Sequence, residues 1–331
     1  MIIVTGGAGF IGSALIYELN KLKIDNIIIV DRLHKDKRWL NIRGLKYDTF
    51  IHADDFLSSN ILDNSALKGV FHLGACSATT ETDVDYLMKN NVEYSKKIFQ
   101  ACAEKNIPLV YASSAATYGS GEYGYDDSHE VVSKLKPLNP YGYSKQFFDE
   151  WVLRQKRKPN KWFGVKFFNV FGPNEYHKGS MASVVFHAHN QIKDTGKVKL
   201  FNSYNPEFED GEQKRDFVYV KDVCLAMLKL MNDAKPEASG IYNLGTGVAR
   251  SFNDLTKATF TAMKKAPKIE YIEMPETLRS QYQYFTQAKM EKFNNLFPDF
   301  KFRSLEDAVA DYHQHLMQTD HYLSWTPDAQ V

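Results

Sequence analysis

Short apolar segments alternate with longer amphipathic segments over the first half of the chain. The apolar segments are continuous, which is typical of strands in a parallel sheet that is buried on both faces. They cover residues 2–4, 27–30, 70–73, 109–112 and 165–170, and helical periodicity covers residues 13–23 and 84–105. This βαβ rhythm predicts an α/β fold with a doubly wound parallel sheet over about the first 170 residues.

The rhythm weakens after the turn sequence Phe-Gly-Pro-Asn at residues 171–174. Two later apolar runs, residues 217–220 and 241–244, could return to the main sheet or to its edge. We therefore expect a first domain of residues 1–173 and about 216–247. A smaller, mixed α/β C-terminal domain is expected to contain residues 174–215 and 248–331, so it is discontinuous in sequence.

The composition fits a folded protein and excludes several kinds of partner. Hydrophobic residues make up 44% of the 331 residues and charged residues 24%, unlike a disordered chain. Forty-one lysines and arginines are balanced by 40 aspartates and glutamates, and the net charge of +1 provides no field that would attract nucleic acid or a membrane surface. Recognition of a phosphate must therefore be local.

Cysteine usage and the N-terminal sequence favour a cytoplasmic protein. From the N-terminal sequence we expect no signal peptide, and no apolar run approaches the ~18 residues that a membrane span needs. No Cys-x-x-Cys spacing occurs among the three cysteines, which are Cys76, Cys102 and Cys224. Two histidine pairs at spacing i, i+2 should lie on different helix faces, so we expect no metal site; they are His187 with His189 and His313 with His315.

A glycine-rich turn between the first strand and the first helix predicts a dinucleotide site. Gly6, Gly9 and Gly12 permit a tight turn, close approach of a pyrophosphate to the backbone, and close packing of helix on sheet. The helix N-terminus then offers free N–H groups to the phosphates. Asp31 ends the second strand, where an acid that binds ribose is expected, and this pattern is that of a Rossmann fold. The neighbouring Arg32 leaves the choice between NAD and NADP open, because a guanidinium can bind a 2′-phosphate.

A second group of residues predicts acid–base chemistry. Asn139 and Pro140 form a helix start, and Tyr141 and Lys145 follow at i and i+4 on one helix face. An ammonium group and a cationic nicotinamide nearby both favour the phenolate, so Tyr141 can act as an acid or base at an alcohol or carbonyl.

A buried strand that ends in hydroxyl side chains should reach the same crevice. The carboxyl ends of parallel strands form the ligand crevice of such sheets, where a serine can bind the reacting oxygen. Ser114 is the candidate at the end of strand 109–112, whereas Ser113 and Thr117 are expected to cap the following segment.

Five stretches of sequence together resemble the extended short-chain dehydrogenase/reductases that act on nucleotide sugars. They are residues 5–12, 74–77, 141–145, 177–183 and 214–220. Within that family, the chain is most similar to the ADP-heptose 6-epimerases, over essentially its whole length. The first and third stretches occur across the superfamily, whereas His-Lys-Gly-Ser-Met-Ala-Ser at residues 177–183 is specific to the 6-epimerases.

The resemblance implies an internal redox cycle at C6 of ADP-D-glycero-D-manno-heptose, in lipopolysaccharide core biosynthesis. NADP takes a hydride from C6, a transient 6-ketone forms, and the hydride returns to the opposite face. Either face of the ketone then needs its own proton-transfer group. The family's two bases match Tyr141 and Lys178, with Ser114 and Lys145 in support.

The resemblance also implies binding residues. The cofactor contacts that match are Phe10, Ile11, Asp31, Arg32, Leu73, Gly74, Ala75, Cys76, Ser77 and Asn90, with Lys145 and the three glycines. The substrate contacts that match are Asn169, Ser180, His187, Phe201, Arg215 and Tyr282. Arg215 suits a diphosphate because its guanidinium can bind two oxygens, although a salt bridge to Asp216 or Asp222 is the alternative. The chain departs from the family at Asn174, where an arginine is common, in the long loop 119–128 and in a tail from about residue 318.

Three alternatives remain to be weighed. A dehydratase would place an acid pair after Ser114, and none is present. A UDP-sugar 4-epimerase would share the glycine loop, Ser114, Tyr141 and Lys145 but would not require Lys178. A non-catalytic, NADP-binding regulator could dispense with Tyr141 and Lys145. The expected partner is a nucleotide sugar, with no nucleic acid and no membrane, and the family resemblance implies a homo-oligomer.

Overall fold

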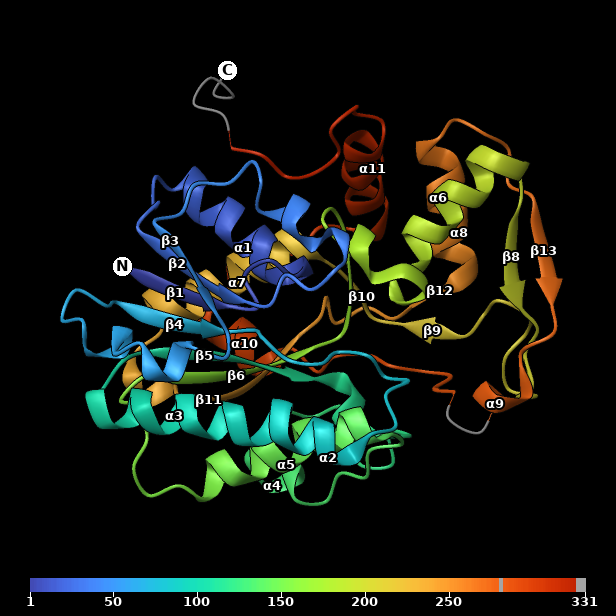
Figure 1. Cartoon of the computed structure of the whole chain (residues 1–331). Coiled ribbons are helices and arrows are strands. Elements are labelled where there is room, and N and C mark those ends of the chain that lie inside the picture. The colour runs from blue at the N-terminus through green and yellow to red at the C-terminus, as the bar shows by residue number, and fades with distance from the viewer. Residues whose placement is uncertain (280–281, 326–331) are drawn as a thin grey trace.

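The computed structural model describes residues 1–279 and 282–325. Within these residues, seven parallel strands form the main sheet (Figure 1). In spatial order they are β11 (Gly240–Leu244), β6 (Trp162–Phe167), β5 (Leu109–Ser114), β4 (Gly69–His72), β1 (Ile2–Thr5), β2 (Ile27–Asp31) and β3 (Thr49–His52). The predicted doubly wound sheet is confirmed, and the run at 241–244 is its edge strand.

Helices cover both faces of the main sheet (Figure 1). One face carries α1 (Phe10–Lys21) and α7 (Val220–Asp233), and the other carries α2 (Val84–Leu87), α3 (Tyr94–Lys105), α4 (His129–Val132) and α5 (Pro140–Arg154). Successive strand residues enter opposite cores. Ile3 and Ile28 pack with the α3 and α5 side, whereas Val4 and Ile29 pack with the α1 and α7 side. This double burial explains why the strand sequences are continuously apolar.

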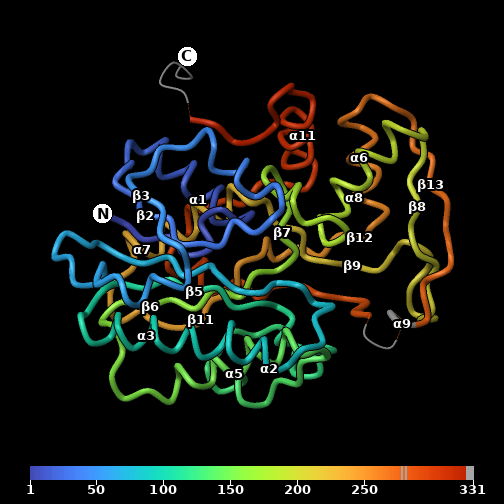
Figure 2. Tube along the Cα trace, viewed as in Figure 1, coloured from blue at the N-terminus to red at the C-terminus, as the bar shows by residue number. Residues whose placement is uncertain are grey.

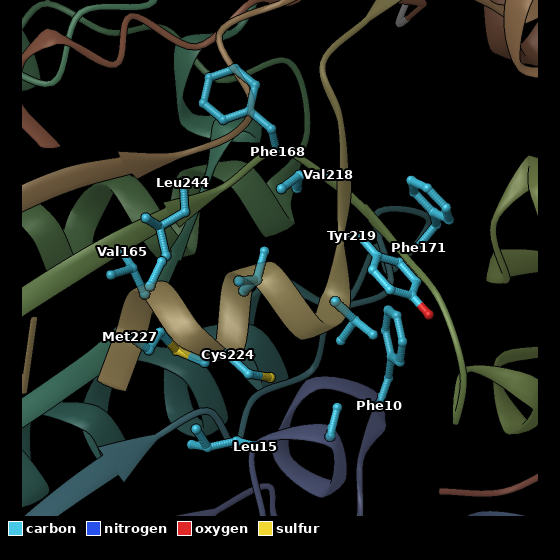
Figure 3. Close-up of a cluster of buried hydrophobic side chains, with 14 of the residues drawn as sticks. Phe10, Leu15, Val165, Phe168, Phe171, Val218, Tyr219, Cys224, Met227 and Leu244 are labelled. Carbon is cyan, nitrogen blue, oxygen red and sulfur yellow. The ribbon is translucent and has the colours of Figure 1, made fainter. Parts of the chain in front are cut away.

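The larger core lies between the sheet and the helices α1 and α7. Cys224 and Met227 of α7 are fully buried and lie on the side of that helix toward Leu15 of α1 (Figure 3). The same cluster continues to Phe168 and Phe171, beyond the end of β6. The larger core therefore packs the main sheet against the segment that follows β6.

Two predicted elements are interrupted. The helix expected at 84–105 consists of α2, a π-helical turn at Met88–Glu93, and α3. The strand expected at 165–170 leaves the main sheet after Phe167. The chain then forms β7 (Asn169–Phe171), which pairs in parallel with β10 (Phe217–Tyr219) in a separate two-stranded sheet. The run at 217–220 therefore does not return to the main sheet.

The remaining elements lie mostly to one side of the sheet (Figure 1). They are α6 (Val184–Thr195), β8 (Val198–Phe201), β9 (Lys214–Arg215), β12 (Arg250–Ser251), α8 (Phe252–Ala262), β13 (Ile269–Ile272), α9 (Glu276–Arg279) and α11 (Leu305–Leu316), whereas α10 (Glu291–Leu296) packs near β11. Their own small core includes Ile192, Val198 and Phe260. Among the described helices, none has the length and apolar character of a membrane span.

Candidate active site

A cavity of about 840 Å³ opens at the carboxyl ends of the strands of the main sheet. All four candidate catalytic residues line it: Ser114, Tyr141, Lys145 and Lys178. The candidate cofactor residues also line it: Gly6, Gly9, Phe10, Ile11, Gly12, Asp31, Arg32, Leu73, Gly74, Ala75, Cys76, Ser77 and Asn90. Motifs that are far apart in sequence therefore converge on one space.

The glycine loop is shaped so that other residues would not fit. Gly6 has a φ of +68°, and a Cβ there would lie 2.7 Å from the Cα of Gly74. A Cβ on Gly12 would lie 2.1 Å from the carbonyl oxygen of Gly6. The cap residue of α1 is Gly9, which has no side chain to occupy the free N–H groups of the first turn. These groups are therefore available to a pyrophosphate.

The end of β2 presents one carboxylate and two guanidinium groups. Asp31 accepts hydrogen bonds from the backbone N–H of Ala8 at 2.9 Å and of Arg32 at 2.7 Å. Burial raises the pKa of Asp31, and these hydrogen bonds oppose that rise. The Arg32 guanidinium pairs with Asp54 at 2.5 Å. Arg38, which sequence reasoning missed, pairs with Asp36 at 2.8 Å and also lines the cavity.

A chain of hydrogen bonds fixes the loop after β4. Gly74 N–H donates to Thr5 Oγ1 at 3.1 Å, and Thr5 Oγ1 lies 2.7 Å from His72 Nδ1. On the other side, His72 Nε2 lies 2.8 Å from Ser95 Oγ, which donates to the carbonyl of Asn91. Ser95 therefore accepts from Nε2, and Thr5 donates to Nδ1. Burial lowers the pKa of His72 to about 3, which keeps this ring neutral.

Asn91 connects this loop to the helix that carries Tyr141. Its carboxamide accepts from Cys76 N–H at 2.8 Å and donates to the Cys76 carbonyl at 2.9 Å. The same Nδ2 donates to Ser144 Oγ at 3.1 Å, and Ser144 donates to the carbonyl of Tyr141. Asn91 lies in the π-helical turn, so the interruption of the predicted helix places a side chain between two walls of the cavity.

The start of α5 agrees with its sequence prediction. Asn139 caps the helix by accepting from Gly142 N–H at 2.8 Å, and Pro140 is its first residue. Burial raises the pKa of Tyr141, while a hydrogen bond with the Ser114 side chain lowers it. Lys145 Nζ donates to the Ala112 carbonyl at 3.0 Å. Burial lowers the pKa of Lys145 to about 8, against the attraction of the Asp149 carboxylate.

The roles expected for the hydroxyl residues need a correction. Ser114 caps the following turn by accepting from Ala116 N–H at 3.1 Å, whereas Ser113 donates to Asp149 at 2.6 Å. Asp149 also forms a fully buried ion pair with Lys166 at 2.6 Å. Ser113 also lines the cavity, but its hydroxyl is bound to a buried carboxylate, and the strand-end hydroxyl that caps the turn is that of Ser114.

Lys178 lines the cavity from the short 3-10 helical segment Tyr176–Met181. Its ammonium is 5.2 Å from the centre of the Phe10 ring. Burial lowers the pKa of Lys178, and the nearby Glu175 carboxylate opposes that shift. Glu175 is fully buried and accepts from both the N–H and the hydroxyl of Ser183, each at 2.6 Å. Glu175 was not predicted, because its role depends on this contact eight residues away.

Comparison with known proteins assigns this arrangement to a family. Residues 2–245 match the family model described as NAD dependent epimerase/dehydratase. The chain belongs to this family. Two curated relatives are ADP-L-glycero-D-manno-heptose-6-epimerases from Fusobacterium nucleatum and Nitratidesulfovibrio vulgaris, at 54% and 46% identity, each covering 98% of this chain and 100% of the relative. The crystal structure of Helicobacter pylori ADP-L-glycero-D-manno-heptose-6-epimerase has a TM-score of 0.75 at 30% identity and covers 95% of both chains.

These matches confirm the resemblance that the sequence motifs indicated. The family assignment also fits the site, because the glycine loop, Tyr141 and Lys145 all lie within the matched residues. Lys178 lies within them too and lines the same cavity.

Arg215 of this epimerase-family chain is a buried cation that faces the cavity. Only 7% of it is exposed, and its guanidinium lies 5.7 Å from the Phe252 ring and 5.2 Å from the Tyr282 ring. Over the described residues, no carboxylate forms a salt bridge with it. The alternative pairing with Asp216 or Asp222 is therefore wrong.

Both aspartates are engaged elsewhere. Asp216 accepts from the backbone of Thr246, Gly247 and Ala288, and Asp222 pairs with Arg303. Burial lowers the pKa of Arg215, so an anion in the cavity would relieve an unfavourable burial of charge.

The six predicted substrate contacts do not all reach the cavity. Asn169 and Arg215 line it, and Tyr282 stacks against Arg215 without lining it. The other three do not line it: Ser180 is exposed in the Lys178 loop, His187 is partly buried on α6, and Phe201 ends β8. Gln283 and Thr286 line the cavity although no motif marked them.

The structure also brings together one histidine from each pair in the sequence. His189 on α6 and His313 on α11 have their Nδ1 atoms 3.3 Å apart. Burial lowers the pKa of both rings, for His189 to about 4. Among the described residues, no group of three or more potential metal ligands surrounds them.

Proposed function

We propose that the protein is an NADP-dependent epimerase that inverts C6 of ADP-D-glycero-D-manno-heptose through a transient 6-ketone. The observation that carries this proposal is that Tyr141 and Lys178, from separate segments, line the same cavity. A reaction that removes and returns a hydride on opposite faces needs a proton-transfer group for each face. The names of the curated relatives support the same substrate.

The residues present fit a nicotinamide dinucleotide. The Gly6 and Gly12 positions leave no room for a side chain, and the first turn of α1 has free N–H groups for the pyrophosphate. When bound, the nicotinamide supplies the acceptor and donor of the hydride. Arg32 and Arg38 favour NADP over NAD as the cofactor, because both guanidinium groups border the cavity near Asp31. Each now pairs with a partly exposed aspartate and could bind a 2′-phosphate in its place.

The chain's own residues move the protons. In one half of the cycle a base accepts the C6 hydroxyl proton, and in the other half an acid donates a proton to the ketone oxygen from the other face. Burial lowers the pKa of Lys178, which makes the neutral amine that can accept a proton more accessible than in an exposed lysine. Tyr141 is held protonated by burial, and positive charge from Lys145 and the bound cofactor would favour its phenolate.

Arg215 is the proposed ligand of the substrate diphosphate. It is buried beside two aromatic rings and faces the cavity, and a diphosphate would give its N–H donors paired acceptors. We also propose that residues 1–173 with about 216–247 bind the dinucleotide, and that residues 174–215 with 248–331 bind the sugar nucleotide.

The direct test is to incubate the protein and NADP with ADP-D-glycero-D-manno-heptose and to follow the C6 epimer by NMR. Conversion of the heptose, with no change in a UDP-hexose incubated in parallel, is the expected result. Conversion of the UDP-hexose alone would instead favour a 4-epimerase. Binding of NADP without turnover of either sugar would favour a regulator.

A further inference from the structure

The chain after α11 crosses back to the N-terminal part of the molecule. Residues 320–325, here called the C-terminal strap, run from α11 toward the segments around α1 and β2 (Figure 2). Leu323 in the strap is 1% exposed and packs in the larger core together with Ile42 and Leu45. The strap is therefore part of the folded structure and not a loose end.

One side of the strap holds the segment that precedes Lys178. Leu323 N–H donates to Asn174 Oδ1 at 2.9 Å, and the Tyr176 hydroxyl donates to the carbonyl of His321 at 2.9 Å. The Tyr176 ring also packs edge-on against His321, with ring centres 4.5 Å apart. Asn174 is fully buried and has a φ of +75°, so its backbone depends on such contacts.

The other side of the strap holds the segment after Arg38. Trp325 N–H donates to the Gly44 carbonyl at 2.8 Å, and the Lys46 ammonium lies 3.7 Å from the centre of the Trp325 ring. A Cβ on Gly44 would lie 2.6 Å from Ser324 Cβ, so the two backbones approach closely. The strap thus joins residues 43–46 to residues 174–176.

The four consecutive residues before Lys178 each contact another segment of the chain. Asn174 binds the strap and also donates to Ser13 of α1 at 2.9 Å, whereas Glu175 binds Ser183. Tyr176 binds the strap, and His177 lies 3.1 Å from the Asn41 carboxamide. Lys178 follows these four residues directly and, like His177, lines the cavity.

We propose that the C-terminal strap is a positioning segment for Lys178, and that Asn174 and Tyr176 transmit its position to this lysine, which lines the same cavity as Tyr141. This inference rests on the proposed function, in which Lys178 serves one face of the ketone. The proposal also gives a role to Asn174, which stands where the family commonly has an arginine. Its carboxamide accepts a hydrogen bond from the strap and donates one to α1, and so holds the two segments together.

The first test uses Tyr176→Phe, which removes only the hydroxyl that binds the strap. Its matched control is Tyr242→Phe, which removes a hydroxyl bound to the Ala238 carbonyl on the far edge strand. Tyr176→Phe should lower kcat about threefold to tenfold with little change in the KM for NADP, and Tyr242→Phe should not. In a Lys178→Met background, Tyr176→Phe should change kcat less than twofold. Equal losses in the two backgrounds would overturn the proposal.

The second test does not depend on turnover. Hydrogen exchange of the amides at 174–178 should become at least tenfold faster in Tyr176→Phe and in a chain that ends at Thr319, but not in Tyr242→Phe. Unchanged exchange in both variants would overturn the strap's role, whatever the substrate is. If the unaltered protein fails to convert the ADP-heptose but the exchange rates change as expected, the proposed function fails and the strap's attachment to this loop stands.

Discussion

Lys145 donates a hydrogen bond to the carbonyl of Ala112, 3.0 Å away, two residues before Ser114 on the same strand. The bond ties α5 to β5 directly below Tyr141 and Ser114, so the helix and the strand end cannot shift independently. It also leaves the Lys145 ammonium buried, which lowers its pKa to about 8. One lysine therefore ties the helix that carries Tyr141 to the strand that carries Ser114.

Replacing Tyr141 with phenylalanine should stop chemistry without preventing binding. The variant loses the phenol that exchanges a proton with the C6 oxygen, a contribution of about 10²–10⁴-fold in rate. We expect kcat to fall by that amount while the Kd for NADP changes less than twofold. Tyr143→Phe, an exposed tyrosine on the same helix, is the control and should keep full activity. Unchanged turnover in Tyr141→Phe would remove this residue from the mechanism.

Replacing Lys178 with methionine should affect the two epimers unequally. The ratio of kcat/KM for the two epimers equals the equilibrium constant of the reaction, so no variant can change it. The unequal effect on the two epimers must therefore be measured in the separate half-reactions. In stopped-flow experiments, reduction of the bound nicotinamide by one epimer should slow at least tenfold more than reduction by the other, and Tyr141→Phe should show the opposite preference. Lys193→Met, an exposed lysine on α6, is the control. Equal small losses with both epimers would reduce Lys178 to a binding residue.

Removing either guanidinium beside Asp31 should weaken NADP binding more than NAD binding. A hydrogen bond to a charged phosphate contributes about 1.5–3 kcal/mol, so Arg32→Ala or Arg38→Ala should raise the Kd for NADP at least tenfold. The Kd for NAD should change less than threefold. Lys35→Ala, an exposed lysine in the same loop, should change neither value. A larger loss for NAD than for NADP would contradict the 2′-phosphate assignment.

The sequence predicts the parts of the site that depend on local pattern. The glycine loop, Asp31 at the end of β2, and the start of α5 at Asn139 and Pro140 each require only a few neighbouring residues to be recognised. Their structural context, with strand before turn and turn before helix, is confirmed. The parallel sheet follows from the same kind of signal, because strands buried on both faces leave a continuous apolar record.

Contacts between polar residues that are far apart in the chain produce no comparable pattern in the sequence. Nothing in the helical periodicity at 84–105 shows that one extra residue in a turn directs Asn91 toward Cys76. Arg38 is a single charge among many until the fold brings it to the cavity wall, and Glu175 is one until the fold buries it against Ser183. The same holds for the break after Phe167, because pairing of β7 with β10 depends on a strand that lies 46 residues further along, between Phe171 and Phe217.

Asn91→Ala should loosen the loop after β4 and weaken cofactor binding. The variant leaves the Cys76 N–H and carbonyl without their carboxamide partners, which costs about 1–3 kcal/mol in the free energy of unfolding. The KM for NADP should rise about tenfold, and kcat should fall less. Asn64→Ala, whose carboxamide binds an exposed segment, is the control. A variant with lower stability but an unchanged KM would show that Asn91 supports the fold alone.

Stability should fall as the solution becomes acidic, in part because of His72. Its pKa is about 3 in the folded protein, below the ordinary 6.5, so between these values the unfolded chain binds a proton that the folded chain does not. Stability therefore rises with pH across this window and is lost as pH falls below about 6.5. Between pH 7.5 and pH 5.5 this ring alone should account for about 1.4 kcal/mol of lost unfolding free energy. Urea unfolding at both pH values measures the loss directly.

The variant His72→Asn separates this ring from the other buried histidines. It removes the titrating group, so it should be less stable at pH 7.5 but should lose about 1.4 kcal/mol less than the unaltered protein on going to pH 5.5. His52→Asn, which changes an exposed ring on β3, is the control and should retain most of the acid loss. If His72→Asn and the unaltered protein lose the same free energy, His72 is protonated in the folded state, and its Nδ1 then donates to Thr5 Oγ1 instead of accepting from it.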